Sequence, residues 1–150
     1  MFSGQKSVLI IEDDLDYRNR LSDFLSSRGC DVSIAENGEQ AMDKLLFHRP
    51  SLVVLDMLLP KVDGFGVLEK IRGYPDQEVA ATPILVLSNL SGQEDVEKAS
   101  KYNLVAYLIK SQVTFEDVLN KALDAIYHGS PPPSSLIMDI DLSGNNQYSN

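Results

Sequence analysis

The chain has 150 residues, of which 43% are hydrophobic, and a formal net charge of -9 at pH 7. This length and apolar fraction suffice for one globular domain with a sizeable core. The acidic balance excludes an electrostatic grip on nucleic acid, and no run of roughly 18 apolar residues could span a membrane.

The N-terminal residues and the cysteine content indicate a cellular compartment. Residues 1–6 lack the apolar core of a signal peptide. The single cysteine, Cys30, excludes an internal disulfide and suits a reducing compartment. No pairing of cysteine with histidine predicts zinc, because His48 and His128 are far apart in sequence. We therefore expect a cytoplasmic protein that does not associate with a membrane.

Strand and helix patterns alternate along the chain. Five apolar runs are expected to be strands, over residues 8–11, 31–35, 52–55, 84–87 and 105–109. Helical periodicity follows each run, over residues 16–28, 38–48, 65–72, 93–102 and 115–126. Ser91 with Glu94, and Thr114 with Asp117, predict capping boxes for the last two helices. The connection over residues 73–82 is expected to be a long, mobile loop.

This alternation predicts the fold class. Right-handed crossovers between successive strands give a parallel sheet with helices on both faces. The run Leu52 to Leu55 has no alternating polar residue, which is typical of a central strand, whereas residues 31–35 alternate in part and belong at the edge. We predict an α/β, doubly wound, five-stranded parallel sheet in the order 2-1-3-4-5. Residues 1–129 are expected to form this domain, and residues 130–150 a Pro/Ser-rich linker and a disordered tail.

Polar side chains follow four of the predicted strands at the points where the strands end. They are Glu12 and Asp13, Asp56, Ser88 and Lys110. In the predicted order these four strands are neighbours, and the carboxyl ends of parallel strands share one edge, where the sites of such sheets lie. Singly, each residue could be a helix cap or a solvated charge. Together they place three carboxylates, a hydroxyl and an ammonium group on one rim.

Three carboxylates on one rim require a compensating cation. Two of them about 5 Å apart repel by roughly 3 kcal/mol at an effective dielectric constant near 20. A hard divalent ion with oxygen ligands is therefore expected, and Mg²⁺ is the commonest candidate. Asp56 would then suit nucleophilic attack on a phosphoryl group, with the metal and Lys110 neutralising the transferring oxygens and Ser88 bonding one of them.

Four segments carry a resemblance to a known family. They read VLIIEDD at residues 8–14, LDMLLPKVDG at 55–64, ILVLS at 84–88 and AYLIK at 106–110. In this order they resemble the receiver domain of two-component response regulators, which has a flavodoxin-like fold, over about residues 5–128. The resemblance implies that Asp56 is the phosphoacceptor in a phosphorelay, supplied by a sensor histidine kinase or a phosphotransfer protein.

The resemblance also assigns the Mg²⁺ ligands. They would be Glu12, Asp13, Asp56 and the main-chain carbonyl of Leu58. The chain would then be a signalling phosphoacceptor and not an enzyme, catalysing only its own phosphorylation and dephosphorylation.

Three further residues have implied roles in a conformational switch. Ser88 would be the switch hydroxyl, Lys110 the lysine that pairs with the phosphate, and Tyr107 the switch aromatic, whose ring turns inward as Ser88 moves. The surface formed by residues 93–102, 105–109 and 115–126 would bind a downstream protein or a second copy of the chain.

The sequence departs from the family pattern near the rim. A small residue usually follows the switch hydroxyl, but here Asn89 does, and it is expected to hinder water or the phosphodonor. Proline, often in a cis bond, usually follows the lysine, but here Ser111 does. A cis bond before a residue other than proline costs roughly 2.5–4 kcal/mol. Residues 102–104 replace a small Gly-Ala helix end. None of these changes removes a reacting group.

Three other classes of protein stay open. A receiver-like adaptor would bind partners without being phosphorylated. A hydrolase with an aspartyl-phosphate intermediate would need a second acid two residues after the nucleophile, where Leu58 stands. A flavin-binding protein would need a phosphate loop rich in Ser, Thr and Gly after the first strand, where this chain has acids. No output domain follows residue 130, so we expect a stand-alone receiver or a fragment of a longer protein.

Overall fold

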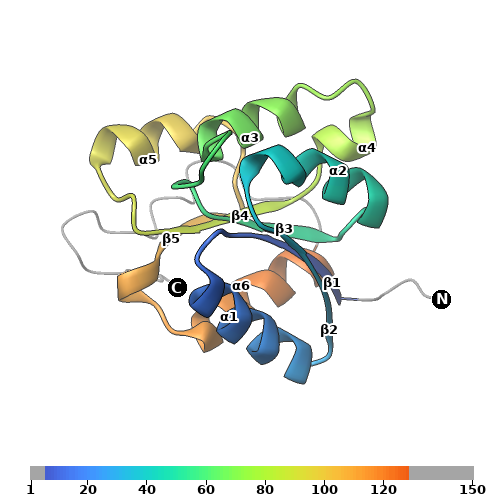
Figure 1. Cartoon of the computed structure of the whole chain (residues 1–150), viewed down its shortest axis with the longest axis vertical. Coiled ribbons are helices and arrows are strands. Elements are labelled where there is room, and N and C mark those ends of the chain that lie inside the picture. The colour runs from blue at the N-terminus through green and yellow to red at the C-terminus, as the bar shows by residue number, and fades with distance from the viewer. Residues whose placement is uncertain (1–5, 129–150) are drawn as a thin grey trace.

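The computed structural model describes residues 6–128 and shows a five-stranded parallel sheet between two layers of helices (Figure 1). The strands are β1 (Lys6–Ile11), β2 (Cys30–Ala35), β3 (Leu52–Leu55), β4 (Ile84–Ser88) and β5 (Ala106–Ile109). Their order is β2-β1-β3-β4-β5, and all neighbouring pairs are parallel. The predicted fold class and strand order are confirmed. The predicted linker and tail, residues 130–150, lie outside the described residues.

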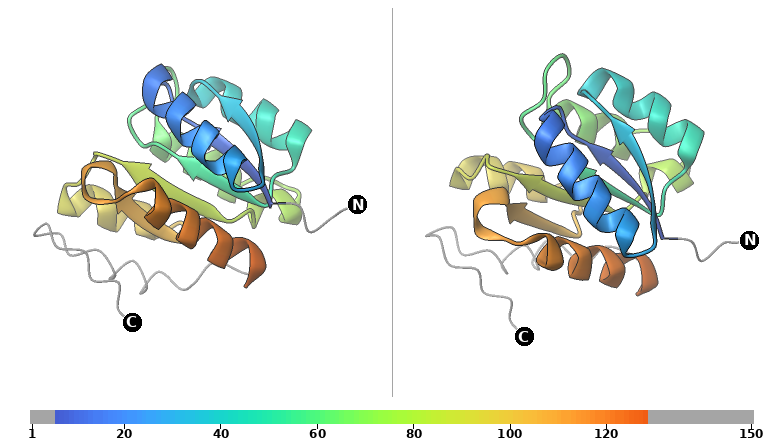
Figure 2. Two further views of the ribbon diagram at one scale, coloured as in Figure 1. Left: turned by 90° about the horizontal axis from the view of Figure 1, so that it is seen from below. Right: turned by 60° about the horizontal axis from the view of Figure 1, so that its bottom comes forward.

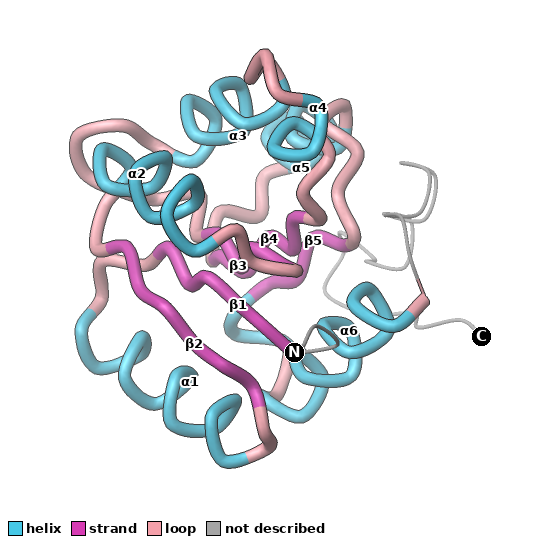
Figure 3. Tube along the Cα trace, turned by 90° about the vertical axis from the view of Figure 1, so that its right-hand side faces the viewer, coloured by secondary structure: helices cyan, strands magenta, loops and turns pink. Residues whose placement is uncertain are grey.

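The helices divide between the two faces of the sheet. They are α1 (Leu15–Ser27), α2 (Gly38–His48), α3 (Gly64–Arg72), α4 (Gln77–Ala80), α5 (Gln93–Ser100) and α6 (Phe115–Tyr127), with a 3-10 turn, η1 (Lys110–Gln112). The pair α1 and α6 covers one face, and α2, α3 and α5 cover the other (Figures 1 and 3). Figure 2 shows α1 and α6 side by side. The ring centres of Tyr17 in α1 and Phe115 in α6 are 5.5 Å apart.

The core lies on both faces of the inner strands. Every residue of β3, β4 and β5 is buried, whereas β2 has a mixed pattern with three half-buried residues and one exposed one. Burying a Val, Leu or Ile side chain stabilises the fold by about 1.5–3 kcal/mol. The unbroken apolar runs therefore provide most of the driving force, and the mixed pattern of β2 agrees with its place at the edge.

The register of the sheet determines which side chains meet at its carboxyl edge. Ile11 pairs with Leu55, and Ser88 pairs with Ile109. The main-chain N–H of Asp56 donates to the carbonyl of Ile11 at 3.0 Å, which continues the β1–β3 ladder by one residue. The residues directly after β1, β3 and β5, together with the last residue of β4, therefore lie along one edge.

A close backbone approach fixes the segment after β3. The N–H of Gly64 donates to the carbonyl of Met57 at 3.0 Å, and Asp63 caps α3 by accepting from the N–H of Gly66 at 3.0 Å. A Cβ atom at Gly64 would lie 2.4 Å from the Cα atom of Met57, so only glycine allows this contact. The start of α3 thus presses on the residue that follows Asp56.

Two sequence predictions about local structure are wrong. Residues 73–82 are not one long loop, because Asp76 caps the short helix α4, whose Val79 and Ala80 are buried. Ser91 does not cap α5, because that helix begins at Gln93 and its N-cap is Gly92, which offers no side chain. Ser91 stands one residue too early for its hydroxyl to serve as the N-cap acceptor.

The capping box at the start of α6 is confirmed. The hydroxyl of Thr114 accepts from the N–H of Asp117 at 3.0 Å, and the Asp117 carboxylate accepts from the N–H of Thr114 at 2.9 Å.

Among residues 6–128, no helix combines the length and apolar character needed to cross a membrane.

Candidate functional site

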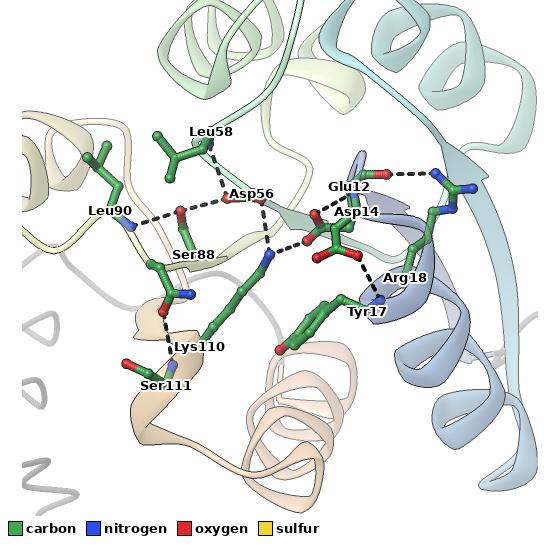
Figure 4. Close-up of polar contacts among 11 residues, drawn as sticks. Glu12, Asp14, Tyr17, Arg18, Asp56, Leu58, Ser88, Leu90, Lys110 and Ser111 are labelled. Carbon is green, nitrogen blue, oxygen red and sulfur yellow. Dashed lines mark hydrogen bonds and ion pairs between the residues drawn. The ribbon is translucent and has the colours of Figure 1, made fainter.

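Asp56 stands directly after β3 and is 5% exposed. Three donors contact its carboxylate (Figure 4). The hydroxyl of Ser88 donates to Oδ1 at 2.6 Å, and the main-chain N–H of Leu58 donates to the same oxygen at 3.1 Å. The Lys110 ammonium donates to Oδ2 at 3.1 Å. The predicted convergence of Asp56, Ser88 and Lys110 is therefore seen in the structure.

Lys110 bridges Asp56 to Glu12. Its Nζ atom lies 2.7 Å from Glu12 Oε1, and the side chains of Lys110 and Glu12 are 11% and 3% exposed. Glu12 also accepts a hydrogen bond from the N–H of Asp14 at 3.1 Å. The guanidinium of Arg18, which is buried, donates to the main-chain carbonyl of Glu12 at 3.1 Å. Both the backbone and the carboxylate of Glu12 are thus fixed in place.

Burial and neighbouring charges change the protonation of this pair. Burial raises the pKa of Glu12 to about 7, with a further upward contribution from the charge of Asp56, although the hydrogen bond from Lys110 opposes the shift. Burial lowers the pKa of Lys110, but the hydrogen bond to Glu12 and the charge of Asp56 outweigh it, so the pKa is raised above its ordinary value. Lys110 is therefore charged at neutral pH.

The raised pKa of Glu12 makes stability depend on pH. The folded protein holds the Glu12 proton more tightly than the unfolded chain, whose ordinary value is 4.5. This contribution to stability is full below about pH 4.5 and is lost as the pH rises through about 7. The melting temperature of the metal-free protein should therefore fall between about pH 5 and pH 8, and Glu12→Gln should flatten that change. If the melting temperature fell equally with pH in both proteins, Glu12 would not be the group responsible.

Three carboxylates at this edge could hold a metal ion. One oxygen each from Glu12, Asp13 and Asp56 lies within 4.8 Å of the others, with Asp13 exposed and the other two buried. Oxygen ligands of this kind suit a hard divalent cation such as Mg²⁺, and the open side at Asp13 leaves room for water ligands. The N–H of Leu58 bonds to Asp56. A metal bond from the Leu58 carbonyl stays a prediction.

Tyr107 occupies the interior of β5. Its side chain is fully buried, and its hydroxyl donates to the main-chain carbonyl of Leu90 in the connection between β4 and α5. Burial raises the pKa of Tyr107, and the charge of Asp95 adds to the shift, so the phenol is neutral. In this structure the Tyr107 ring points into the protein interior while the Ser88 hydroxyl contacts Asp56. A movement between two positions stays a prediction.

Two contacts to Lys110 and to the turn that it begins were not predicted from the sequence. The Lys110 Nζ atom lies 4.4 Å from the centre of the Tyr17 ring, and burial with the charge of Glu12 raises the pKa of Tyr17 to about 12. Tyr17 lies in α1 and Lys110 begins η1, and local patterns in the sequence do not relate two residues so far apart along the chain. Asn89 Oδ1 accepts a hydrogen bond from the N–H of Ser111 at 3.1 Å. No cis peptide bond occurs between residues 6 and 128, so the bond before Ser111 is trans.

Comparison with known proteins identifies the family. A family model described as "Response regulator receiver domain" matches residues 8–124. The chain belongs to this family. The predicted resemblance is therefore confirmed over most of the chain.

Two named relatives of this receiver domain are longer proteins. It is 33% identical over 105 residues to the "Regulator of RpoS" of Escherichia coli (strain K12), a match that covers 70% of this chain and 30% of that protein. It is 30% identical over 156 residues to the "Probable transcriptional regulator ycf27" of Porphyridium aerugineum, covering 97% of this chain and 63% of that one. The chain thus spans less than two thirds of either relative.

Solved structures agree with the fold. A response regulator receiver protein from Pseudomonas putida matches with a TM-score of 0.75 and 25% identity, covering 82% of this chain and 99% of that one. A two-component response regulator from Clostridium difficile matches with a TM-score of 0.73 and 28% identity, covering 83% and 97%.

Proposed function

We propose that this receiver domain accepts a phosphoryl group on Asp56 from a sensor histidine kinase or a phosphotransfer protein, in the presence of Mg²⁺. The observation that carries the proposal is the environment of the Asp56 carboxylate. Donors from β4, from the first residue of η1 and from the segment after β3 contact its two oxygens, and one carboxylate oxygen each of Glu12 and Asp13 lies within 4.8 Å of an Asp56 oxygen. Nucleophile, charge compensation and metal ligands thus meet in one place.

The transfer uses groups already aimed at Asp56. An oxygen of the carboxylate forms a bond to phosphorus while the bond from phosphorus to the histidine nitrogen of the donor breaks, and the imidazole leaves. The Lys110 ammonium pairs with the incoming phosphoryl oxygens, and the Ser88 hydroxyl and the Leu58 N–H can each donate to one of them. Mg²⁺ held by Glu12, Asp13, Asp56 and the Leu58 carbonyl would supply further charge neutralisation.

Phosphorylation would then act on the surface formed by α5, β5 and α6. The phosphoryl group adds about two negative charges and three acceptor oxygens beside Ser88. Only Val96 and Ala99 of α5 are buried, and no side chain caps its N-terminus, so this helix can shift at modest cost. The phosphate must favour one arrangement by several kcal/mol for it to dominate. A downstream protein or a second copy of the chain would bind the shifted surface.

This proposal makes the chain a cytoplasmic signalling protein, not an enzyme acting on other substrates. An adaptor that is never phosphorylated would use the same surface without chemistry at Asp56. The three donors on one buried carboxylate favour the phosphoacceptor, because an adaptor has no need for them.

The test is phosphorylation by a small donor. The wild-type protein, incubated with Mg²⁺ and acetyl phosphate, should gain one phosphoryl group by intact mass, and Asp56→Asn should gain none. Asp124→Asn, on the exposed side of α6, should behave like the wild type. A folded wild-type protein that binds Mg²⁺ but gains no phosphoryl group would favour the adaptor.

A further inference from the structure

Hydrogen bonds hold the last residue of β4, Ser88, and the start of the connection from β4 to α5 in place beside Asp56. The Ser88 hydroxyl donates to Asp56, and the N–H of Leu90 donates to the Ser88 oxygen at 3.2 Å (Figure 4). The Leu90 carbonyl accepts from the Tyr107 hydroxyl. Ser88 and Leu90 are thus both tied to neighbouring strands, and Asn89 lies between them.

Asn89 makes the contact to the turn that follows β5. Its Oδ1 atom accepts from the main-chain N–H of Ser111 in η1, at 3.1 Å. The last ladder pair of the two strands is Ser88 with Ile109. The Asn89 side chain therefore continues the connection between β4 and β5 beyond the end of the sheet, where main-chain pairing has stopped.

This bond joins the two residues that directly follow Ser88 and Lys110. Ser88 contacts one oxygen of Asp56 and Lys110 contacts the other. A lysine side chain is long and flexible, so the position of its ammonium group depends on how firmly its Cα atom is held. The start of η1 is the backbone that holds it.

We propose that Asn89 is a positioning residue for phosphoryl transfer. Its side chain holds η1, the turn that begins at Lys110, against the segment that follows Ser88. The inference rests on the proposed function of Asp56. Asn89 touches no reacting atom, and it acts through Lys110. The donor is a main-chain N–H, so the side chain of Ser111 is not required, but a residue without an N–H, such as proline, could not form this bond.

Three variants distinguish the effect of the hydrogen bond between Asn89 and the Ser111 N–H from the effects of Asn89 side-chain volume and of the Ser111 side chain. Asn89→Ala removes the acceptor and the bulk, Asn89→Leu removes the acceptor but keeps the bulk, and Ser111→Ala keeps the main-chain donor. With saturating Mg²⁺ and acetyl phosphate, both Asn89 variants should be phosphorylated about 3- to 10-fold more slowly, the range expected for one ordinary hydrogen bond. Ser111→Ala should keep the wild-type rate.

Amide hydrogen exchange gives a readout that does not need phosphorylation. The protection of the residue 111 N–H should fall in both Asn89 variants and persist in Ser111→Ala, with melting temperatures close to that of the wild type. Wild-type rates in both Asn89 variants would overturn the inference while leaving Asp56 as the phosphoacceptor. A faster rate in Asn89→Ala alone would assign a steric role to Asn89 and also overturn it. Wild-type protein that acetyl phosphate does not phosphorylate would refute both the role of Asn89 and the role of Asp56 as phosphoacceptor.

Discussion

Lys110→Met is expected to lower the free energy of unfolding of the metal-free protein by about 3–5 kcal/mol, the usual effect of removing one partner from a buried ion pair. The Lys110 ammonium lies 2.7 Å from Glu12 and 3.1 Å from Asp56, and the side chains of all three residues are nearly buried. Methionine keeps the apolar stem but leaves two carboxylates facing each other without a cation. Urea unfolding at about pH 8 measures the loss.

Matched measurements identify the cause of that loss. Adding Glu12→Gln to Lys110→Met removes one of the two carboxylates and should recover most of the stability. The loss should also shrink at about pH 5, where Glu12 is protonated because burial raises its pKa to about 7. Lys101→Met, at an exposed position after α5, should change stability by no more than about 0.5 kcal/mol. A Lys110→Met protein as stable as the wild type at pH 8 would refute the charge-compensation argument.

Arg72→Met is expected to destabilise the fold by about 3 kcal/mol, because two of its acceptor residues, Ala80 and Thr82, are buried, and a buried carbonyl left without a donor costs about 1–3 kcal/mol. Arg72 ends α3, and its guanidinium donates to four main-chain carbonyls: Tyr102 at 2.6 Å, Ala80 at 2.7 Å, Thr82 at 2.7 Å and Asn103 at 3.1 Å. It therefore connects α3, the end of α4, the segment before β4 and the turn before β5. Burial lowers the pKa of Arg72.

Geometry, rather than charge, should account for this effect. Arg72→Lys keeps the charge, but a single ammonium cannot reach acceptors on both sides as the planar guanidinium does, so it should recover at most about half of the lost stability. Lys70→Met, on the exposed face of the same helix, is the control and should stay within about 0.5 kcal/mol of the wild type. Chemical denaturation of the three variants compares them. Full recovery by lysine would contradict the geometric account.

The fold and the composition of the rim were predictable from local patterns. An unbroken run such as Leu52 to Leu55 indicates a strand covered on both faces, and the residue that follows it must then lie at the carboxyl edge. The same reasoning brought Glu12, Asp56, Ser88 and Lys110 together without any knowledge of their distances. It succeeded because sheet order fixes where strand ends lie, whatever the loops do.

The contacts that were missed depend on the tertiary structure. Arg72 reads as an ordinary charge at a helix end, since its acceptors are main-chain carbonyls that carry no signal in the sequence. Asn89 was expected to crowd the site, but its oxygen bonds to the N–H of Ser111 from another strand end. The start of α5 at residue 93 was predicted correctly, but its N-cap was wrongly assigned to Ser91, because Ser91 and Glu94 fit a capping pattern that would begin the helix one residue earlier.

The central proposal is that separate strand ends form one metal-dependent phosphoacceptor at Asp56. The most direct measurement is to phosphorylate the wild-type protein with acetyl phosphate, reduce the acyl phosphate with borohydride, and locate the resulting homoserine by peptide mass spectrometry. The proposal predicts homoserine at position 56 alone, and only when Mg²⁺ was present. Homoserine at another aspartate, the corresponding alcohol at a glutamate, or equal modification after chelation of the metal would contradict it.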